Sequence, residues 1–421
     1  MAALYATNIP LGKGPDETAH IRYITWLADH HSLPVFSRES PGADYEFHQP
    51  PLYYLISLPA YLMSPRGQVA EQTVRFANII IGIALLYLTF ALGRALAPDH
   101  PWVPPAATAV VAFLPMHLAL ASTAGNDVLA EVFAAAALLV MVYYLRTAAS
   151  HRSQQSERPS ASAAAAIGLF IGLGILTKSL AALLLPVAWV AFALAARGPN
   201  GFDWRRLARD MAATTVVALL VAGWWLLRNQ ALYGDLLAQK AFLSAFRDRP
   251  SPQQMMQFQH LSPSLYLAEV IAWTLASVLG VFGPVYGNRF VFYPYWVYLI
   301  FGTKGLAEGV SFLRYLAVGK LAGWQRQAWG ISALLGLLLL ASFIRFNLSF
   351  FQAQARYLFP ALPAASVAFC LGLEGLVPRR FAATALVAGI SLLALLAVGG
   401  LFVWVSPQFQ IPIPSSAGAQ P

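Results

Sequence analysis

Residues 381–404 read FAATALVAGISLLALLAVGGLFVW, a continuous apolar stretch without a charged side chain. A helix rises about 1.5 Å per residue, so roughly 20 apolar residues cross the ~30 Å hydrocarbon core of a bilayer. The apolar residues are continuous rather than alternating, which argues against a strand of a membrane barrel. The stretch therefore predicts a transmembrane helix.

Nine further runs share this apolar character, and one more region is ambiguous. Residues 265–283 are interrupted by Gly280 and Gly283 and followed by Pro284, which is typical of a re-entrant or surface-lying segment. Apolar residues make up 58% of the 421 residues and charged ones only 11%. We therefore predict an all-α polytopic membrane protein with a bundle of about ten transmembrane helices. The other nine runs are 74–97, 104–121, 128–146, 162–177, 179–197, 211–228, 297–317, 328–346 and 357–376.

The spacing of these runs predicts three parts of the chain. Residues 1–73 form a first external loop with interfacial helices and an acidic motif. Residues 74–405 form the transmembrane bundle, in which 229–296 is a second large external or re-entrant segment. Residues 406–421 are rich in Pro, Ser and Ala, which predicts a disordered tail. Cys370 is the single cysteine, so an intramolecular disulfide is excluded.

The net charge of +9 has its explanation in the loops between the spans. Basic residues concentrate in four loops, which all lie on one side if ten spans cross and 265–283 does not. Cytoplasmic loops of membrane proteins carry such an excess of Lys and Arg, so we assign this side to the cytoplasm and expect no nucleic-acid partner. These residues are Arg146, Arg152 and Arg158; Arg197, Arg205, Arg206 and Arg209; Lys320 and Arg326; and Arg379 and Arg380.

The opposite, extracytoplasmic side carries the unusual polar residues. The first is Pro15-Asp16-Glu17, followed by His20. Carboxylates this rare, placed just outside a bilayer, favour chemistry on a membrane-bound substrate, with Asp16 and Glu17 as candidate general bases. The alternative is that they cap a helix and complement its dipole.

Two interfacial helices are expected in the same loop. After Pro15, Ile21, Ile24 and Leu27 recur at helical spacing, which predicts an amphipathic helix lying in the membrane interface. A second such helix follows Pro50-Pro51. Together they would form a platform over the transmembrane bundle.

A second acidic position lies between two spans on this side. Asp127, preceded by Asn126, is a candidate catalytic acid, with capping of the following helix as the alternative. Glu131 falls one turn further, inside a span. An acidic residue there is costly, so we expect a basic partner from a neighbouring helix or a hydrogen-bonded neutral form.

Three cations at span ends complete the set. Lys178, Arg228 and Arg356, the last beside Tyr357, predict a clamp for a lipid phosphate or pyrophosphate, and snorkelling to the interface is the alternative for each. His48 precedes the Pro-Pro turn and, with His20, is a candidate substrate-binding residue.

The sequence bears on two classes of bound group, a divalent metal and a nucleotide. A divalent metal held by His20, His48 and the carboxylates remains open, although the chain has no metal-ligand spacing, and no cofactor is certain. Gly-rich nucleotide-binding motifs are absent from the sequence, which disfavours a soluble nucleotide donor. An activated group carried by a membrane lipid remains.

Six motifs, in this order, resemble the polyprenyl-phosphate-dependent glycosyltransferases of the GT-C fold. These include protein O-mannosyltransferases and the lipid A aminoarabinose transferase, and the chain looks most similar to their bacterial relatives. The likeness runs from about Pro15 to Pro363. The motifs are PDETAH, HQPPLYY, GNDVLAEV, GILTKSLAALLLP, WWLLRNQALYGD and QARYLFPALP.

The resemblance implies inverting transfer of a sugar from a polyprenyl-phosphate donor to a lipid, glycan or protein acceptor. It implies an integral protein of the bacterial cytoplasmic (inner) membrane, among membrane lipids, with an extracytoplasmic active site. The family's acidic positions carry over to Asp16, Glu17 and Asp127, with Asp16 as the base. Its basic groups carry over to Lys178, Arg228 and Arg356.

Two departures from the family pattern stand out. Only about fifteen residues precede the acidic motif, where the family has a transmembrane helix, and Gln49 stands where lipid A-modifying relatives tend to have Lys. Two other functions therefore stay open. One is a transporter or flippase of lipid-linked saccharide, and the other is a non-catalytic subunit with this fold.

Overall fold

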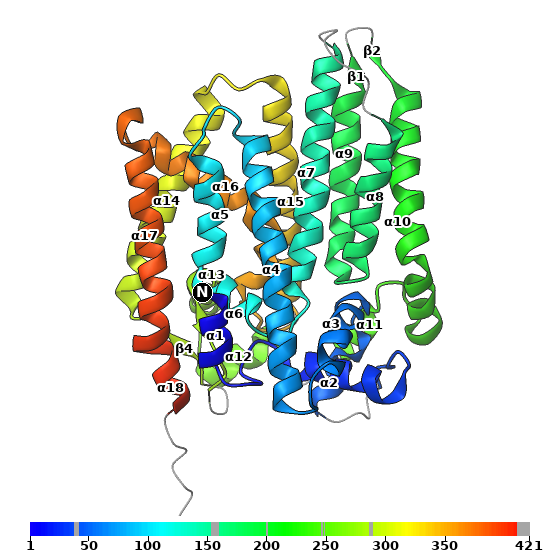
Figure 1. The fold of residues 1–421 in the computed structure, drawn as a ribbon, viewed down its shortest axis with the longest axis vertical. Helices are drawn as coiled ribbons and strands as arrows, with labels where there is room; N and C mark the ends of the chain where they lie inside the picture. Colours follow the sequence, from blue (N-terminus) through cyan, green and yellow to red (C-terminus); the bar gives the residue numbers. More distant parts are fainter. Residues whose placement is uncertain are drawn as a thin grey trace, which may run out of the picture.

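Long helices form a bundle, with short helices gathered at one end (Figure 1). The computed structural model describes residues 1–37, 42–152, 160–198, 201–245, 247, 249–285 and 289–410. Helices α2, α3, α11 and α12 lie at the lower end in Figure 1, and the β1–β2 hairpin lies at the opposite end. The all-α polytopic membrane fold predicted from the sequence is confirmed.

The first half of the chain holds α2 and α3 of the lower end and four of the long apolar helices. Its elements are α1 (Ala2–Asn8), α2 (Glu17–His30), η1 (Gly42–His48), α3 (Leu52–Leu62), α4 (Gln68–Leu96), α5 (Val103–Phe113), α6 (Pro115–Ala121), α7 (Asp127–Arg152), α8 (Ala161–Ile175), η2 (Ser179–Leu183), α9 (Leu184–Ala196), β1 (Arg197–Gly198), β2 (Gly201–Phe202) and α10 (Trp204–Tyr233).

The second half contains the bent pair α12–α13 and the remaining long helices. Its elements are α11 (Gln239–Ala245), α12 (Pro252–Gln259), α13 (Pro263–Leu279), β3 (Val281–Phe282), β4 (Val291–Phe292), α14 (Tyr295–Val318), α15 (Gly323–Asn347), η3 (Ala355–Ala361), α16 (Leu362–Gly375), η4 (Arg379–Phe381), α17 (Ala382–Gly400), η5 (Leu401–Val405) and α18 (Ser406–Gln410).

Within the described ranges, seven helical stretches are long and apolar enough to cross a membrane, or nine if each bent helix pair is one span. The predicted number of about ten is consistent with this. The difference lies in α8, which is short, and in α14, which is outside the seven and carries the ion pair between Lys304 and Glu308.

Prolines account for the two bent pairs. Helices α5 and α6 meet at 67° where Pro115 follows Leu114, and α12 and α13 meet at 106° just before Pro263. A proline pushes the preceding residue out of the helical region, and Leu114 is extended, with ψ of 115°. The ambiguous region 265–283 is thus α13 with strand β3, which pairs with β4 antiparallel.

Two glycines set the spacing between α8 and α10. A Cβ atom at Gly168 would lie 2.4 Å from the carbonyl oxygen of Thr214, and one at Gly172 would lie 2.7 Å from the Val221 Cβ. Helices in membranes associate through such small residues, because their backbones can then approach closely. Helices α8, α9 and α10 therefore pack into one side of the bundle (Figure 1).

Both helices predicted within residues 1–73 are present, as α2 and α3. Helix α2 buries Ile21, Ile24 and Leu27, and Tyr23 of α2 stacks on Tyr54 of α3 with ring centroids 3.7 Å apart. The amide of Leu52 donates to the carbonyl of Leu176, which ties α3 to the corner between α8 and η2. This packing holds the start of α2 over the bundle.

Two of the boundaries that the sequence predicts between parts of the chain, at 73/74 and at 405/406, differ in the structure. Helix α4 starts at Gln68 and runs through position 74 without a break, because the polar first turn continues the apolar helix. Residues Ser406–Gln410 continue the last helix as α18, so they do not belong to a disordered tail. Residues 411–421 lie outside the described residues.

Candidate active site

Asp16 stands at the start of α2 in a left-handed conformation, with φ of 56°. Asp tolerates this region better than most residues, and strained positions cluster at functional sites. Its carboxylate makes no capping hydrogen bond to α2. Instead it accepts one from the Tyr45 hydroxyl at 2.7 Å and forms an ion pair with Arg356. Asp16 is thus the N-cap residue of α2 by position, but its carboxylate contacts Arg356 and not the helix.

Arg356 joins two carboxylates from distant parts of the chain. Its Nη2 pairs with Asp16 and its Nη1 lies 3.2 Å from Oδ2 of Asp127. Asp127 also pairs with Lys178 through its other oxygen. The start of α2, the start of α7, the corner before η2 and the start of η3 supply one residue each. We call Asp16, Asp127, Lys178 and Arg356 the acid–base cluster.

Tyr357 lies beneath both cations of the cluster. The Lys178 ammonium is 5.4 Å and the Arg356 guanidinium 5.2 Å from its ring centroid, within the range of a cation–π contact. Two carboxylates and two cations balance in charge. Burial alone would raise the pKa of Asp16, but the charge and hydrogen bond of Arg356 outweigh it and hold that pKa below its usual range. Asp16 is therefore ionised at neutral pH.

His20 lies one turn along α2 and is buried beside the cluster. Its Nδ1 is 2.9 Å from the Tyr54 hydroxyl. Burial lowers the pKa of His20 to about 4, although the charges of Asp16 and Asp127 act in the opposite direction. A neutral imidazole is what the balanced cluster requires, since a further positive charge there would have no counterion.

Glu17, proposed above as catalytic beside Asp16, makes its contacts elsewhere. Its carboxylate forms a buried two-pronged ion pair with Arg75, with contacts of 2.6 and 2.7 Å. It also accepts from the amides of Gly12, Gly14 and Ala124. Adjacent residues at a helix start point in different directions, so the structure gives Glu17 a role in holding the loop.

Gly14 allows the loop to lie close to the bundle at this point. A Cβ atom at position 14 would be 2.4 Å from the side chain of Thr123, a distance that no side chain tolerates. The glycine therefore brings the loop against the turn before α7 and sets Asp16 near Asp127.

Arg228 and His48 do not contact the cluster directly. Arg228 donates to the carbonyl of Pro34 at 2.7 Å and stacks on Trp225. His48 donates from Nδ1 to the carbonyl of Tyr45 at 2.7 Å. Arg228 thus fastens the first external loop to α10, and His48 fixes the segment that carries Tyr45.

Glu131, one turn after Asp127 on α7, lies beside the buried imidazole of His117 from α6. Nε2 of His117 is 3.3 Å from its carboxylate, and both side chains are buried. Among the described residues, both oxygens of the Glu131 carboxylate are without a hydrogen-bond partner. The structure thus places a histidine next to the acidic residue inside a span, but it shows no hydrogen bond between the two side chains.

Across the described parts of the chain, no three His, Cys, Asp or Glu side chains gather as a metal-binding group. His20 and His48 each have a different hydrogen-bond partner, Tyr54 and the Tyr45 carbonyl. The structure therefore does not bring the two histidines and the carboxylates together as a ligand set.

Glu46 is a buried acid that sequence reasoning missed. It lies in η1, only 3% exposed, next to Tyr45, which contacts Asp16. Burial and the charge of Asp16 raise the pKa of Glu46 to about 8, although Lys178 and Arg356 act in the opposite direction. The only signal was an acid between two aromatic residues, Tyr45 and Phe47, which has no helical or alternating pattern.

The raised pKa of Glu46 predicts a pH-dependent stability. The folded chain holds this proton more tightly than the unfolded one, so its stabilising contribution is complete below about 4.5 and is lost as pH rises through about 8. Glu46→Gln cannot ionise. We expect the stability of the variant relative to the wild type to rise between these pH values, measured by thermal unfolding in detergent. A constant difference across that range would contradict a protonated Glu46.

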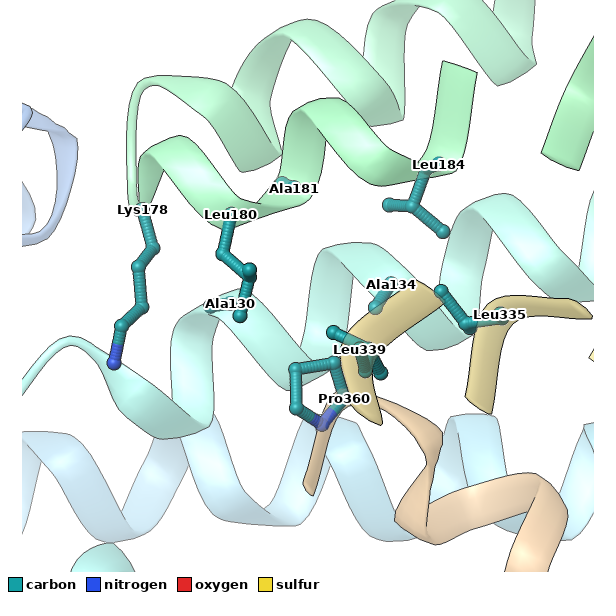
Figure 2. A pocket seen from close by; sticks show the side chains of 9 residues that line it. All are labelled: Ala130, Ala134, Lys178, Leu180, Ala181, Leu184, Leu335, Leu339 and Pro360. Atoms are coloured by element: carbon teal, nitrogen blue, oxygen red, sulfur yellow. The ribbon is translucent and has the colours of Figure 1, made fainter. Parts of the chain in front are cut away.

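A small apolar pocket adjoins Lys178. Figure 2 shows the Lys178 side chain at one end and Leu184 and Leu335 at the other. Helices α7, α9 and α15 with η2 and η3 provide its walls. The residues that line it are Ala130, Ala134, Lys178, Leu180, Ala181, Leu184, Leu335, Leu339 and Pro360.

The family model described as Dolichyl-phosphate-mannose-protein mannosyltransferase matches residues 47–234. No curated protein sequence matches the chain significantly. The structure is similar to the oligosaccharyltransferase AglB from Archaeoglobus fulgidus, solved with an inhibitory peptide and a dolichol-phosphate (TM-score 0.54, 14% identity, 97% of this chain and 55% of that one). It is also similar to ArnT from Cupriavidus metallidurans bound to undecaprenyl phosphate (TM-score 0.52, 17% identity, 97% of this chain and 72% of that one).

These likenesses show the fold. The chain is an integral membrane protein with the GT-C fold, which confirms the resemblance inferred from its six motifs. The chain spans only about half the length of the archaeal protein.

Proposed function

We propose that the protein is a membrane glycosyltransferase that moves a sugar from a polyprenyl-phosphate donor to an acceptor. The observation that carries the proposal is the acid–base cluster, in which Arg356 joins Asp16 and Asp127 and Lys178 lines a small apolar pocket. A lipid phosphate needs cations for its headgroup and an apolar surface for its chain, and the two adjoin at Lys178. The match to the mannosyltransferase family and the two lipid-phosphate-bound relatives support the same chemistry.

The reaction uses Asp16 as the general base. The acceptor gives its proton to Asp16, its oxygen or nitrogen forms a bond to the anomeric carbon, and the bond from that carbon to the phosphate oxygen breaks. The polyprenyl phosphate leaves with the electron pair, and the anomeric configuration inverts. Asp16 is ionised, as a base must be, and Arg356 orients it.

Lys178 and Arg356 stabilise the negative charge that develops on the leaving phosphate. Without a donor, these cations pair with the aspartates. A bound phosphate would share their hydrogen bonds and loosen the hold on Asp16, which brings the base into play only when donor is present. Such fixed charges act strongly in a buried site, because water does not screen them.

The membrane and the side are inferred from charge. The basic loops identify the cytoplasmic side, and the cluster lies at the opposite ends of the same helices. We place the protein in the bacterial inner membrane with the cluster facing outward. Labelling of single cysteines introduced in the 197–202 hairpin and in α2, with a membrane-impermeant reagent on intact cells, tests the side.

Transfer from a labelled polyprenyl-phosphate sugar, by protein reconstituted in vesicles, tests the function. Release of polyprenyl phosphate together with a labelled acceptor supports a transferase. Movement of intact donor across the bilayer without cleavage would instead show a flippase. Absence of both would identify a non-catalytic protein with this fold.

Arg356 is expected to govern donor affinity. Arg356→Lys keeps the charge but cannot bridge two carboxylates or hold a phosphate with two nitrogens. We expect the affinity for polyprenyl phosphate to fall about tenfold or more, since a hydrogen bond to a charged group contributes roughly 1.5–3 kcal/mol. Isothermal titration in detergent measures it. The control is Arg345→Lys, because Arg345 is exposed and lies in the last turn of α15, the helix that precedes η3. Equal affinities in the two variants would refute the role of Arg356.

A further inference from the structure

Glu46 has an unfilled hydrogen-bonding position inside the site. Its side chain is 3% exposed, and among the described residues its Oε2 has no hydrogen-bond partner. Gln49 contacts the carboxyl group but does not satisfy that oxygen. A buried polar atom without a partner costs about 1–3 kcal/mol, so such atoms in a folded protein need an explanation, for example a missing ligand.

The cations of the cluster do not fill this position. Lys178 and Arg356 are near enough for their charges to act on Glu46, yet they pair with Asp127 and Asp16. Glu46 thus lies near the cations of the proposed phosphate site but outside their ion pairs. With its pKa raised to about 8, it is mostly protonated at neutral pH and can donate a hydrogen bond.

His48, two residues further along η1, offers a hydrogen-bond acceptor, where Glu46 offers a donor. Its Nδ1 donates to the Tyr45 carbonyl, so Nε2 of the neutral ring is an acceptor. Nε2 is buried and has no partner among the described residues. Burial lowers the pKa of His48 to about 4, which keeps the ring neutral.

Aromatic rings pack against His48. The His48 ring meets Phe36 at 5.9 Å and Phe242 at 5.5 Å, and Phe242 leads through Phe346 to Tyr357. A neutral donor, a neutral acceptor and aromatic walls suit the hydroxyl groups and apolar faces of a sugar ring. They do not suit a second phosphate, since they carry no positive charge.

We infer that Glu46 and His48 form the subsite that recognises the donor's sugar, separately from the cations that hold its phosphate. The inference rests on the proposed function, because it divides one donor between two neighbouring subsites. It assigns the substrate class as a polyprenyl-phosphate sugar with an uncharged, hydroxylated ring at this position. Glu46 acts there as a hydrogen-bonding acid and not as an anion.

Binding of two lipids to the full-length protein in detergent separates the subsites. The probes are polyprenyl phosphate and polyprenyl-phosphate mannose, measured for wild type, Glu46→Ala and Glu46→Gln. We expect Glu46→Ala to weaken binding of the mannosylated lipid about tenfold and to leave the sugar-free lipid within twofold. Glu46→Gln should restore most of the affinity, because an amide also donates a hydrogen bond. Glu71→Ala, an acid at the start of α4 outside the cluster, is the matched control.

Several results would overturn the inference. Equal losses for both lipids in Glu46→Ala would indicate a structural role, and an unchanged affinity for both would exclude contact with the sugar. A loss in Glu46→Gln as large as in Glu46→Ala would show that charge is needed. Failure of the proposed function is distinguishable: the wild type would then bind the mannosylated lipid with these preferences but would not transfer its sugar.

Discussion

Asp16→Asn is expected to lower the rate of glycosyl transfer by about 10²- to 10⁴-fold, the usual contribution of a general base. The amide keeps the size of the side chain and still accepts a hydrogen bond from Tyr45, but it cannot take a proton from the acceptor. It also leaves Arg356 paired with Asp127 alone. Single-turnover transfer from a labelled polyprenyl-phosphate sugar measures the chemical step without product release.

The matched control for this prediction is Asp29→Asn on the same helix. Asp29 forms an exposed ion pair with Arg66, and such pairs contribute little. We expect this variant to transfer at the wild-type rate. Asp16→Asn with near wild-type transfer would remove Asp16 as the base, and Asp127 would become the remaining candidate.

Arg75→Met is expected to destabilise the protein by about 3–5 kcal/mol, the usual effect of removing one partner from a buried ion pair. Arg75 is fully buried and pairs with Glu17. It also donates to the carbonyls of Ala6, Ile9 and Pro10. Without it, a buried carboxylate loses its cation and three carbonyl groups each lose a hydrogen bond. Unfolding in mixed micelles with increasing denaturing detergent measures the change.

Arg66→Met is the control for Arg75, because its partner Asp29 and its own side chain are largely exposed. It should change stability by less than about 1 kcal/mol. Glu17→Gln tests the other partner, and combining it with Arg75→Met should cost less than the two single changes added together. Full additivity, or a loss in Arg75→Met as small as in Arg66→Met, would contradict the pairing.

The predictions for Asp16 and Arg75 are linked, because Arg75 helps to hold the backbone segment that contains Asp16. Arg75 and Glu17 hold the segment before α2 against α4, and Asp16 lies within that segment. A variant that loosens the pair should also reduce transfer at temperatures where the protein remains folded. Arg75 is therefore a positioning residue, and its effect on the rate should grow with temperature while that of Asp16→Asn stays constant.

Charge scarcity explains why part of the site could be found from the sequence. Asp127, Lys178 and Arg356 stand out because ionisable groups are rare and these three lie at the ends of apolar runs. Asp16 stands out because it adjoins a second acid, Glu17. Contacts among these four side chains bring them together in one cluster. Glu17 and Arg228 carry the same signal but do not contact the cluster, because position in the sequence does not specify which way a side chain points. Glu46 lacked the signal altogether, since it neither lies at the end of an apolar run nor adjoins a second acid.

The sequence by itself determined that the chain crosses a membrane many times and where its polar residues meet the boundary. Hydrocarbon cannot hydrogen-bond the backbone, so each long apolar run has to be a helix whatever its neighbours are. Only the tertiary structure decided which carboxylate faces which cation. Asp16 and Glu17 are adjacent in sequence, yet one pairs with Arg356 and the other with Arg75, because the direction of each side chain depends on contacts from distant helices.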